Sequence, residues 1–295
     1  MSIRKAAILL CMTVFCSLIA GCGSSQHAEP QSVEDGREAK LEAAYAEAES
    51  LEHAGEYEQA ADYYESLGTF RDSAERLEFV RLEKIRVQIR NTEPGDIITL
   101  GSFEQDDDIS DGSEEIEWEV LEKEGDRLLV ISRYALYSLP FNEKNEEVAW
   151  ESSSIRKWLN GEFYDSAFSD DEKKLILLST LEPAVNKVYK NVSAGDETED
   201  HIFLLGASEA EKYFTSRDEL MCLPTAYAVS SGAWTTEEYT DASGERTCFW
   251  WLRSPGNNEK QAAYVHMEGT INLNGTMVSY GNRTARPALW IGPLN

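Results

Sequence analysis

The sequence lacks the residue patterns on which several classes of enzyme depend. It holds four scattered histidines without an HExxH pair and no glycine-rich phosphate loop, so metallohydrolase and nucleotide chemistry lack their residues. Basic residues are scarce, with 27 Lys and Arg against 54 Asp and Glu and a formal charge of −27. Because binding to phosphate backbones depends on clustered positive charge, nucleic acid is excluded as a partner. We predict no catalytic residues, no cofactor and no metal ligands, with carboxylate pairs brought together by folding as the open alternative.

Long apolar runs are absent except near the start of the chain. Residues 1–21, MSIRKAAILLCMTVFCSLIAG, have a basic head and an apolar run that is short for a bilayer span and typical of an export signal. Ile19-Ala20-Gly21-Cys22 resembles the bacterial lipobox, in which the cysteine thiol takes a diacylglycerol. We predict release of residues 1–21, lipidation of Cys22 and anchoring on the extracytoplasmic face of the cell membrane. A cleaved signal with an incidental cysteine is the alternative.

Cysteine is rare, and only three of the five cysteines follow the export signal. If Cys22 carries lipid, Cys222 and Cys248 form an even pair in an oxidising compartment, which predicts a disulfide between them. Two buried free thiols are the alternative. Neither cysteine belongs to a CxxC pair, which argues against structural zinc.

Two modules follow the export signal. Residues 22–36 are small and polar, and we predict a flexible tether there. Residues 37–91 contain no proline and are rich in Ala, Glu, Leu and Arg with apolar residues three and four apart, which predicts helices. The segments beginning at Gly55 and Gly68 resemble the helix-turn-helix of a tetratricopeptide repeat. They cover about one and a half repeats, fewer than the three or so that a stacked array needs, so we expect a helical hairpin that serves as a stalk. Three aromatic residues could dock a protein partner there: Tyr57, Tyr64 and Phe70.

The pattern changes at Pro94-Gly95 to short β segments interrupted by amphipathic helices. Strands and helices do not alternate strictly, so residues 94–295 are predicted to form one α+β domain. The expected strands are 97–103, 116–121, 127–134, 262–266, 276–280 and 286–291, and the expected helices are 154–163, 170–178 and 208–214.

Two short motifs resemble metal or catalytic sites but fail as such. The acidic stretch Asp106–Gly112 suggests an EF-hand loop, yet the register that places its glycine correctly puts Ile109 and Trp118 at positions that require oxygen ligands. An acidic hairpin tip is expected instead, with a looser Ca²⁺ site as the alternative. Ser154-Ile155-Arg156-Lys157 fits the SxxK pattern of penicillin-recognising enzymes, but the partner motifs SDN and KTG are absent.

The densest aromatic stretch is CFWWLRSPG, from Cys248 to Gly256. Alternate side chains of a strand point to opposite faces, so its two tryptophans cannot enter the same core layer, and Pro255-Gly256 would end the strand in a type II turn. The face with Trp251 is either a second packed layer or a platform for a sugar ring or peptide. The last 48 residues carry a local charge of +2, which indicates an anion site unless their basic side chains pair with carboxylates elsewhere. The predicted ligand-binding residues are Trp234, Trp251, Arg253, Asn257 and Arg286.

Five ordered segments carry a resemblance to a known family: IEWEVLEKEGDRLLVISRYAL, SSSIRKWLNGEFYDSAFSDDEKKLI, CLPTAYAV, FWWLRSPG and ARPALWI. Together they are similar to an uncharacterised bacterial domain family of exported proteins, over about residues 94–293. More distantly, the Trp-rich ending resembles the C-type-lectin-like fold shared with the formylglycine-generating enzyme family. That resemblance implies a mixed fold whose first strand, near Ile97, pairs with the last, near Leu289, and it transfers no active site.

These observations favour a membrane-anchored lipoprotein with a non-catalytic binding or scaffolding domain. Its expected ligand is a cell-surface glycan or an anionic polymer. One alternative is oxidase or hydrolase chemistry, with Cys222 and Cys248 acting as thiols. The other is a protein–protein adaptor that binds its partner through the helical module.

Overall fold

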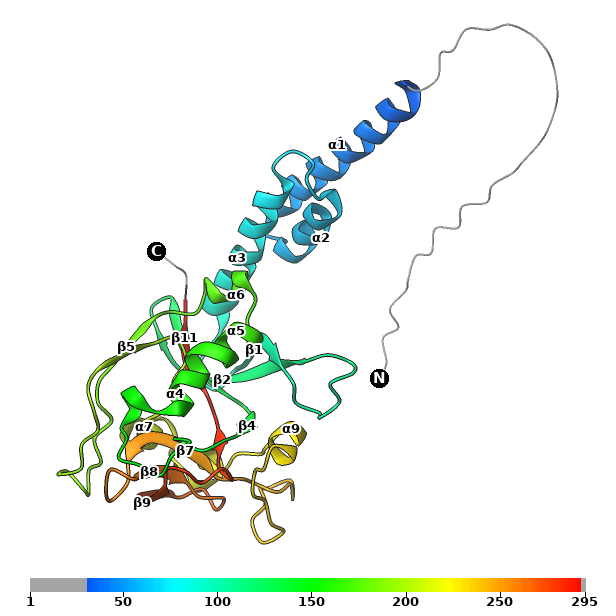
Figure 1. The fold of residues 1–295 in the computed structure, drawn as a ribbon. Helices are drawn as coiled ribbons and strands as arrows, with labels where there is room; N and C mark the ends of the chain where they lie inside the picture. Colours follow the sequence, from blue (N-terminus) through cyan, green and yellow to red (C-terminus); the bar gives the residue numbers. More distant parts are fainter. Residues whose placement is uncertain (1–30, 293–295) are drawn as a thin grey trace, which may run out of the picture.

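The computed structural model describes residues 31–292 (Figure 1). The predicted export signal, Cys22 and most of the predicted tether lie outside this range. Helices and strands are both abundant and do not alternate strictly, which confirms the α+β class. Within the described range, no helix combines the length and the apolar character needed to cross a bilayer.

The N-terminal module is a three-helix unit that projects as a rod from the α+β domain (Figure 1). It consists of α1 (Gln31–Ala54), α2 (Tyr57–Leu67) and α3 (Ser73–Asn91), and α2 packs against both of the others. Gly55 and Gly68 have positive φ angles, 79° and 57°, that L side chains rarely adopt, which explains why the helices break there. The predicted hairpin therefore gains a third helix, and α1 begins inside the range assigned to the tether.

The aromatic residues of this module face its own interior. Tyr64 is fully buried, and its hydroxyl donates to Oε2 of Glu52 at 2.7 Å. Tyr57 and Phe70 are partly buried against the same small core. The docking residues expected from the sequence thus stabilise the helices instead of forming an open aromatic surface.

Helix α3 belongs to both modules. Leu77 and Val80 pack in the core of the three-helix unit, whereas Leu82, Ile85 and Ile89 pack against the core of the α+β domain. Leu82, Ile85 and Ile89 are three and four residues apart and share one face of the helix. The boundary predicted near residue 94 is therefore a packed junction and not a flexible linker.

The first sheet of the α+β domain is antiparallel, in the order β1-β2-β3-β11. Its strands are β1 (Ile97–Phe103), β2 (Glu114–Glu124), β3 (Arg127–Ser132) and β11 (Ala288–Ile291). Ile97 pairs with Glu119 of β2, and Leu289 pairs with Val130 of β3. The expected pairing of the first strand with the last is wrong, because β2 and β3 lie between them and place them at opposite edges.

The second sheet has the order β4-β10-β7-β8-β9. Its strands are β4 (Tyr137–Ser138), β7 (Trp250–Pro255), β8 (Gln261–Val265), β9 (Ile271–Met277) and β10 (Thr284–Ala285). A further pair joins β5 (Ser179–Leu181) and β6 (Thr198–Asp200). The expected strand over 276–280 is displaced, since β9 ends at Met277.

The helices of the domain are short. A continuous helical segment contains α4 (Ser154–Trp158), a π-helical turn (Leu159–Phe163) and α5 (Tyr164–Ala167). The others are a 3₁₀ turn (Trp150–Ser152), α6 (Asp170–Lys173), α7 (Ala207–Tyr213), α8 (Arg217–Leu220) and α9 (Ala226–Ser230). The helix predicted to extend to residue 178 ends at Lys173, after which the backbone N–H of Leu177 donates to the carbonyl of Trp290 at 2.8 Å.

Strand β7 is buried on both faces. Because its side chains alternate between the faces, Trp250 and Trp251 enter two different packed layers. Trp250 packs edge-on against Phe214, and Trp251 packs edge-on against Phe141. The turn predicted at its end is different: Gly256 does not have the positive φ of a type II turn. Glycine fits there because a Cβ would lie 2.7 Å from the carbonyl oxygen of Asn274.

Candidate functional site

Trp251, the centre of the predicted binding face, is fully buried. Its indole Nε1 donates to the carbonyl of Leu139 at 2.9 Å, and its ring lies 5.8 Å from that of Phe141. A ring enclosed in this way has no free face for a ligand. The prediction of Trp251 as a stacking platform is therefore wrong, and the second packed layer is the correct interpretation.

Arg253 is also interior, and it forms an ion pair within the protein. Its guanidinium contacts both carboxylate oxygens of Glu209, with Nη2 to Oε1 at 2.7 Å, and Nη1 donates to the carbonyl of Leu204 at 3.1 Å. Burial by itself would raise the pKa of Glu209, but the hydrogen bonds and charge of Arg253 outweigh it and hold that pKa below its usual range. Arg253 is committed to this pair and not to an external anion.

Arg286 is buried between two aromatic rings, those of Phe214 and Trp250, each 5.2 Å from its guanidinium carbon. Its Nε donates to the carbonyl of Ser132 at 3.0 Å, and Nη2 lies 3.5 Å from a carboxylate oxygen of Glu119. The charge of Arg286, like that of Arg253, is thus paired with a carboxylate of the protein itself. The prediction of Arg286 as a ligand-binding residue is wrong for the same reason as that of Arg253.

Two of the predicted residues remain at the surface. Trp234 is 56% exposed, although its backbone is held by a hydrogen bond from its N–H to the carbonyl of Asn282 at 3.3 Å. Asn257 is exposed in a different loop, where its N–H donates to the carbonyl of Asn274 at 2.8 Å. The structure gives no contact, within residues 31–292, that joins these two side chains into one site.

An open cleft of about 470 Å³ lies next to the Trp234 segment. Thr235, the residue after Trp234, contributes to its wall, and the full lining is Tyr134, Leu223, Pro224, Val229, Thr235, Gly244, Glu245 and Arg246. Backbone hydrogen bonds between Ala135 and residues 223 and 225, both 3.0 Å, fix one wall. Thr225 also caps α9 by accepting from the N–H of Ala228. The cleft combines apolar surface with groups that can form hydrogen bonds, on a rigid backbone.

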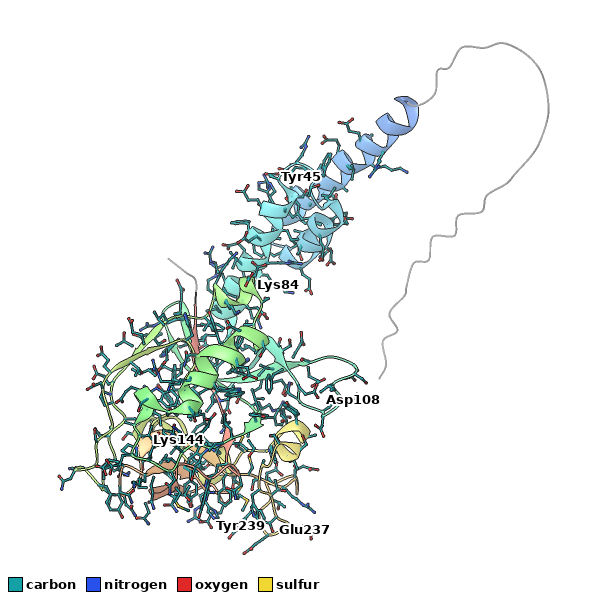
Figure 2. All side chains as sticks on the ribbon, in the orientation of Figure 1. Tyr45, Lys84, Asp108, Lys144, Glu237 and Tyr239 are labelled. Carbon is teal, nitrogen blue, oxygen red and sulfur yellow. The ribbon has the colours of Figure 1, made fainter. Side chains whose placement is uncertain are left out.

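The charged side chains around this cleft are mostly acidic and solvent-exposed. Arg246 forms an ion pair with Glu237 at 2.6 Å, and both side chains are more than half exposed. Glu245 lines the cleft, and Glu238 is exposed in the same loop. Figure 2 places Glu237 and Tyr239 at the end of the domain that lies away from the helical module.

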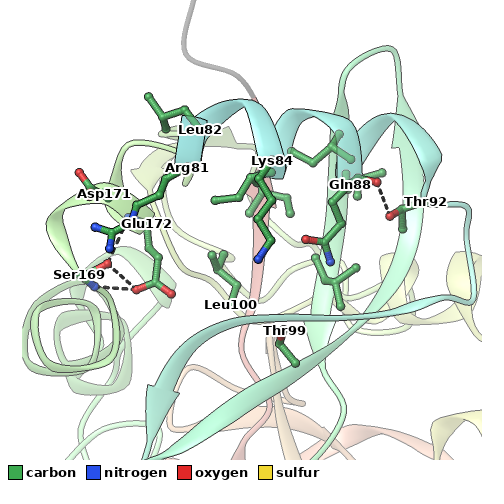
Figure 3. A pocket seen from close by; sticks show the side chains of 15 residues that line it. Arg81, Leu82, Lys84, Gln88, Thr92, Thr99, Leu100, Ser169, Asp171 and Glu172 are labelled. Atoms are coloured by element: carbon green, nitrogen blue, oxygen red, sulfur yellow. Dashed lines mark hydrogen bonds between the residues drawn. The ribbon is translucent and has the colours of Figure 1, made fainter. Parts of the chain in front are cut away.

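A second cavity, of about 370 Å³, lies between α3 and the first sheet (Figure 3). Gln88 reaches from α3 toward β1, and the floor is apolar, with Leu100 among its residues (Figure 3). Its charged groups already have partners: Arg81 pairs with Glu65 at 3.3 Å, and Lys84 pairs with Glu58 at 3.2 Å. Glu172 accepts from the backbone N–H groups of Ser169 and Gly101. We therefore interpret this cavity as a gap at the junction between the helical module and the α+β domain.

Comparison with known families assigns the C-terminal part of the chain to a protein family. A family model described as a domain of unknown function, DUF6273, matches residues 125–293, more than half of the chain. The chain belongs to the DUF6273 family. No curated protein and no solved structure shows significant similarity to it. The prediction of an uncharacterised domain family is confirmed, over a shorter range than the 94–293 expected.

The DUF6273 region distinguishes the two cavities. It begins at the turn between β2 and β3, so it excludes α3 and β1, which form most of the cavity in Figure 3. All residues that line the cleft next to Trp234 lie within it. The cleft therefore lies wholly within the DUF6273 domain. Sequence reasoning singled out Trp234, next to the cleft, but none of the residues that line it. The polar, glycine-containing stretch DASGER at 241–246 is the signal that indicates a surface loop there.

The two cysteines of the DUF6273 domain are buried free thiols, so the predicted disulfide is not present. Their backbones are adjacent, with the N–H of Cys248 donating to the carbonyl of Cys222 at 2.9 Å. Each sulfur also has its own partner: Cys222 Sγ lies 3.6 Å from the carbonyl of Leu223, and Cys248 Sγ lies 3.6 Å from the hydroxyl of Thr284. These contacts orient the sulfurs without a covalent bond.

The two thiols differ in acidity. Burial raises the pKa of Cys248 well above its usual range, and the neighbouring Cys222 raises it further. Burial also opposes ionisation of Cys222, but the hydrogen bond from Cys248 and the charge of Arg286 outweigh it and lower the pKa of Cys222. Neither cysteine is among the residues that line the cavities described above.

Proposed function

We propose that the chain is a lipid-anchored, extracytoplasmic binding protein that recognises a neutral glycan at the cleft next to Trp234. The observation that carries the proposal is Trp234 itself, whose side chain is more than half exposed on a hydrogen-bonded loop. An exposed indole offers a flat apolar face on which a sugar ring can stack, with a polar N–H at its edge. A sugar ring stacked on the indole would extend into the cleft past Thr235.

Charge favours a neutral glycan over an anionic polymer. The chain has a formal charge of −27. Glu245 and Arg246 line the cleft, and Arg246 is already paired with Glu237. An anionic polymer would approach against this potential. Each hydroxyl group of a neutral sugar can instead donate a hydrogen bond to a carboxylate or accept one from the guanidinium.

The arrangement of the modules agrees with a role away from the membrane. The chain enters the structure through α1, and the segment with Glu237 lies at the opposite end of the molecule (Figures 1 and 2). A lipid on Cys22 would hold the α1 end near the membrane and direct the cleft outward. The bacterial origin, the likeness to C-type-lectin-like domains and the likeness of α1 to α3 to a tetratricopeptide unit belong to this proposal and depend on the sequence resemblance.

We favour a non-catalytic role. The free thiol state of Cys222 and Cys248 agrees with the oxidase alternative, which requires reduced cysteines. Both sulfurs are buried, however, and a thiol reacts only with a substrate that reaches it. The adaptor alternative is not favoured, because the aromatic residues expected to bind a partner pack in the interior of the helical module.

Replacing Trp234 by alanine is expected to weaken glycan binding about 2- to 13-fold, because ring stacking contributes about 0.5–1.5 kcal/mol. A glycan array identifies the ligand, and titration calorimetry with that ligand measures the change in affinity. Trp234→Phe keeps a stacking ring and should retain most of the affinity. Tyr63→Ala, which removes an exposed ring of the helical module, is the control and should leave binding unchanged. An array without a neutral glycan ligand, or equal affinity of the alanine variant and the wild type, would contradict the proposal.

The anchor is tested separately. We expect the mature protein from the native host to begin at Cys22, with a mass increase that corresponds to acyl chains. Mass spectrometry of the N-terminal peptide measures both. Cys22→Ser should release the protein from the membrane fraction, whereas Cys222→Ser should not. A mature terminus at another residue would remove the anchor without affecting the glycan site.

A further inference from the structure

Three carboxylates meet at the neck of the loop that joins β1 and β2. One carboxylate oxygen of each of Glu104, Asp106 and Glu114 lies within 4.8 Å of the others. Glu104 directly follows β1, and Glu114 begins β2 opposite Phe103. The backbone N–H of Gln105 donates to Oε2 of Glu114 at 2.6 Å, which fixes the position of this carboxylate. The cluster is therefore built by the end of the sheet and not by a flexible tip.

A second and independent observation concerns Glu104. This residue is only 9% exposed, and its Oε1 atom is buried with no hydrogen-bond partner within residues 31–292. Buried polar atoms are almost always paired, because loss of water without a replacement is costly. The described part of the chain thus leaves one buried carboxylate oxygen of Glu104 without a hydrogen-bond donor.

The described part of the chain provides no cation for the cluster. None of the ion pairs among those residues includes Glu104, Asp106 or Glu114. Other acidic side chains in this domain, such as Glu117 and Glu122, do have Arg or Lys partners. The cluster thus combines three negative charges, an unpaired buried oxygen and close mutual approach.

We propose that Glu104, Asp106 and Glu114 bind a divalent cation of the Ca²⁺ class. The donors are exclusively carboxylate oxygens, which suit a hard cation. Asp106 is exposed, so water can complete the six to eight ligands that Ca²⁺ takes in flexible geometry. Mg²⁺ is less well suited, because it requires near-ideal octahedral geometry. The proposal goes beyond glycan recognition, and two of the three ligands lie outside the Asp106–Gly112 stretch that suggested an EF-hand.

A cation at this neck would stabilise more than the cluster. The loop protrudes from the domain, with Asp108 far out along it (Figure 2). It contacts α9 through two hydrogen bonds, from the N–H of Tyr227 to the carbonyl of Gln105 at 2.9 Å and from Ser230 Oγ to Asp107 Oδ1 at 2.7 Å. Cation binding would therefore order the loop and support α9.

Calorimetric titration of the EDTA-treated protein with CaCl₂ tests the site. We expect one bound ion with a dissociation constant on the order of 10⁻⁴ to 10⁻³ M, typical of extracellular Ca²⁺ modules. Glu104→Gln should weaken binding at least about tenfold, because it removes one ligand charge. Asp111→Asn, at an exposed position of the same loop, is the matched control and should change the affinity less than about twofold. MgCl₂ in place of CaCl₂ should bind more weakly.

Thermal unfolding separates loss of the site from loss of the fold. Ca²⁺ should raise the Tm of the wild type and leave that of Glu104→Gln unchanged. In the absence of Ca²⁺ the Glu104→Gln variant should be at least as stable as the wild type, because it removes an unpaired buried charge. The absence of binding heat and of a Tm shift at about 10 mM Ca²⁺ would overturn the proposal. So would an equal loss of affinity in Asp111→Asn, which would indicate diffuse attraction to an acidic loop, and equal affinity for Mg²⁺ would overturn the Ca²⁺ class.

Discussion

Replacing Trp251 by alanine is expected to lower the free energy of unfolding by about 3–5 kcal/mol. The indole is fully buried, so the substitution leaves a large cavity in the core. It also removes the donor to the carbonyl of Leu139 and the contact of the Arg283 guanidinium, which lies 5.7 Å from the ring centroid. Since domains have about 5–15 kcal/mol of stability in total, this single change would bring the protein close to unfolding.

The chain offers a matched control for this prediction, the same substitution at Trp234. Because that side chain is more than half exposed, Trp234→Ala should change the free energy of unfolding by less than about 0.5 kcal/mol. Urea unfolding measures the free energy of unfolding of both variants, and equal m-values show that the two can be compared. A loss of less than about 1 kcal/mol for Trp251→Ala would mean that the ring does not occupy the core, and the surface interpretation of Trp251 would return.

The features that the sequence predicts well depend on local patterns. The strand over 97–103 has the predicted bounds, and the opposite faces of Trp250 and Trp251 follow from alternation along one strand. The helix starting at Ser154 is also confirmed, since the Ser153 side chain accepts from the N–H of Arg156 and caps it. Propensity, period and capping act over a few residues, so one segment is enough to indicate them.

Features that depend on distant partners could not be predicted in this way. Leu289 pairs with Val130, about 160 positions earlier in the chain, and nothing local to either residue indicates the partner. The same applies to Arg253, whose partner Glu209 is on α7, and to Arg286, which is enclosed by Phe214 and Trp250. Their positive charge suggested a surface site because the sequence does not reveal burial of a charged residue next to a carboxylate.

The two candidate sites differ in how far the sequence indicated them. Trp234 was among the predicted binding residues, but the walls of its cleft come from three separate segments near residues 134, 223–235 and 244–246. The acidic loop was recognised, whereas Glu104 and Glu114 flank it and only the pairing of β1 with β2 brings them together. In both cases tertiary contacts select which residues of a polar stretch share a site.

Replacing Glu209 by glutamine is expected to lower the free energy of unfolding by about 2–3 kcal/mol at neutral pH. Loss of one partner from a buried ion pair costs about 3–5 kcal/mol, because the other charge stays buried and unpaired. Arg253 is buried in this way, whereas the Glu209 side chain is 35% exposed, so solvent screening reduces the effect. Glutamine keeps one oxygen, which can still accept from the N–H of Gly206 at the start of α7. The substitution therefore removes the charge and one of the two acceptors for Arg253 while the helix start keeps its hydrogen bond.

A double-mutant cycle with Arg253→Met separates the ion pair from other effects. With Arg253 replaced, Glu209→Gln should cost less than about 1 kcal/mol, since no buried cation remains to be left unpaired. Urea unfolding of the four proteins gives the coupling energy. An equal cost of Glu209→Gln in both backgrounds would indicate that the helix start, and not the charge pair, determines the effect.

The stability that the Arg253–Glu209 pair contributes is expected to depend on pH. Arg253 holds the pKa of Glu209 below its usual value of 4.5 in the folded state, even though burial opposes this shift. A carboxylate with a lowered folded-state pKa contributes stability that is complete above the unfolded-state pKa and is lost as the pH falls through the folded-state value. The difference between wild type and Glu209→Gln should therefore be constant between about pH 6 and 8 and should shrink below about pH 4.5. If the difference in the free energy of unfolding stays unchanged in acid, the wild-type carboxylate does not stabilise the fold through its charge. Internal pairing with Glu209 would then no longer explain why Arg253 is buried.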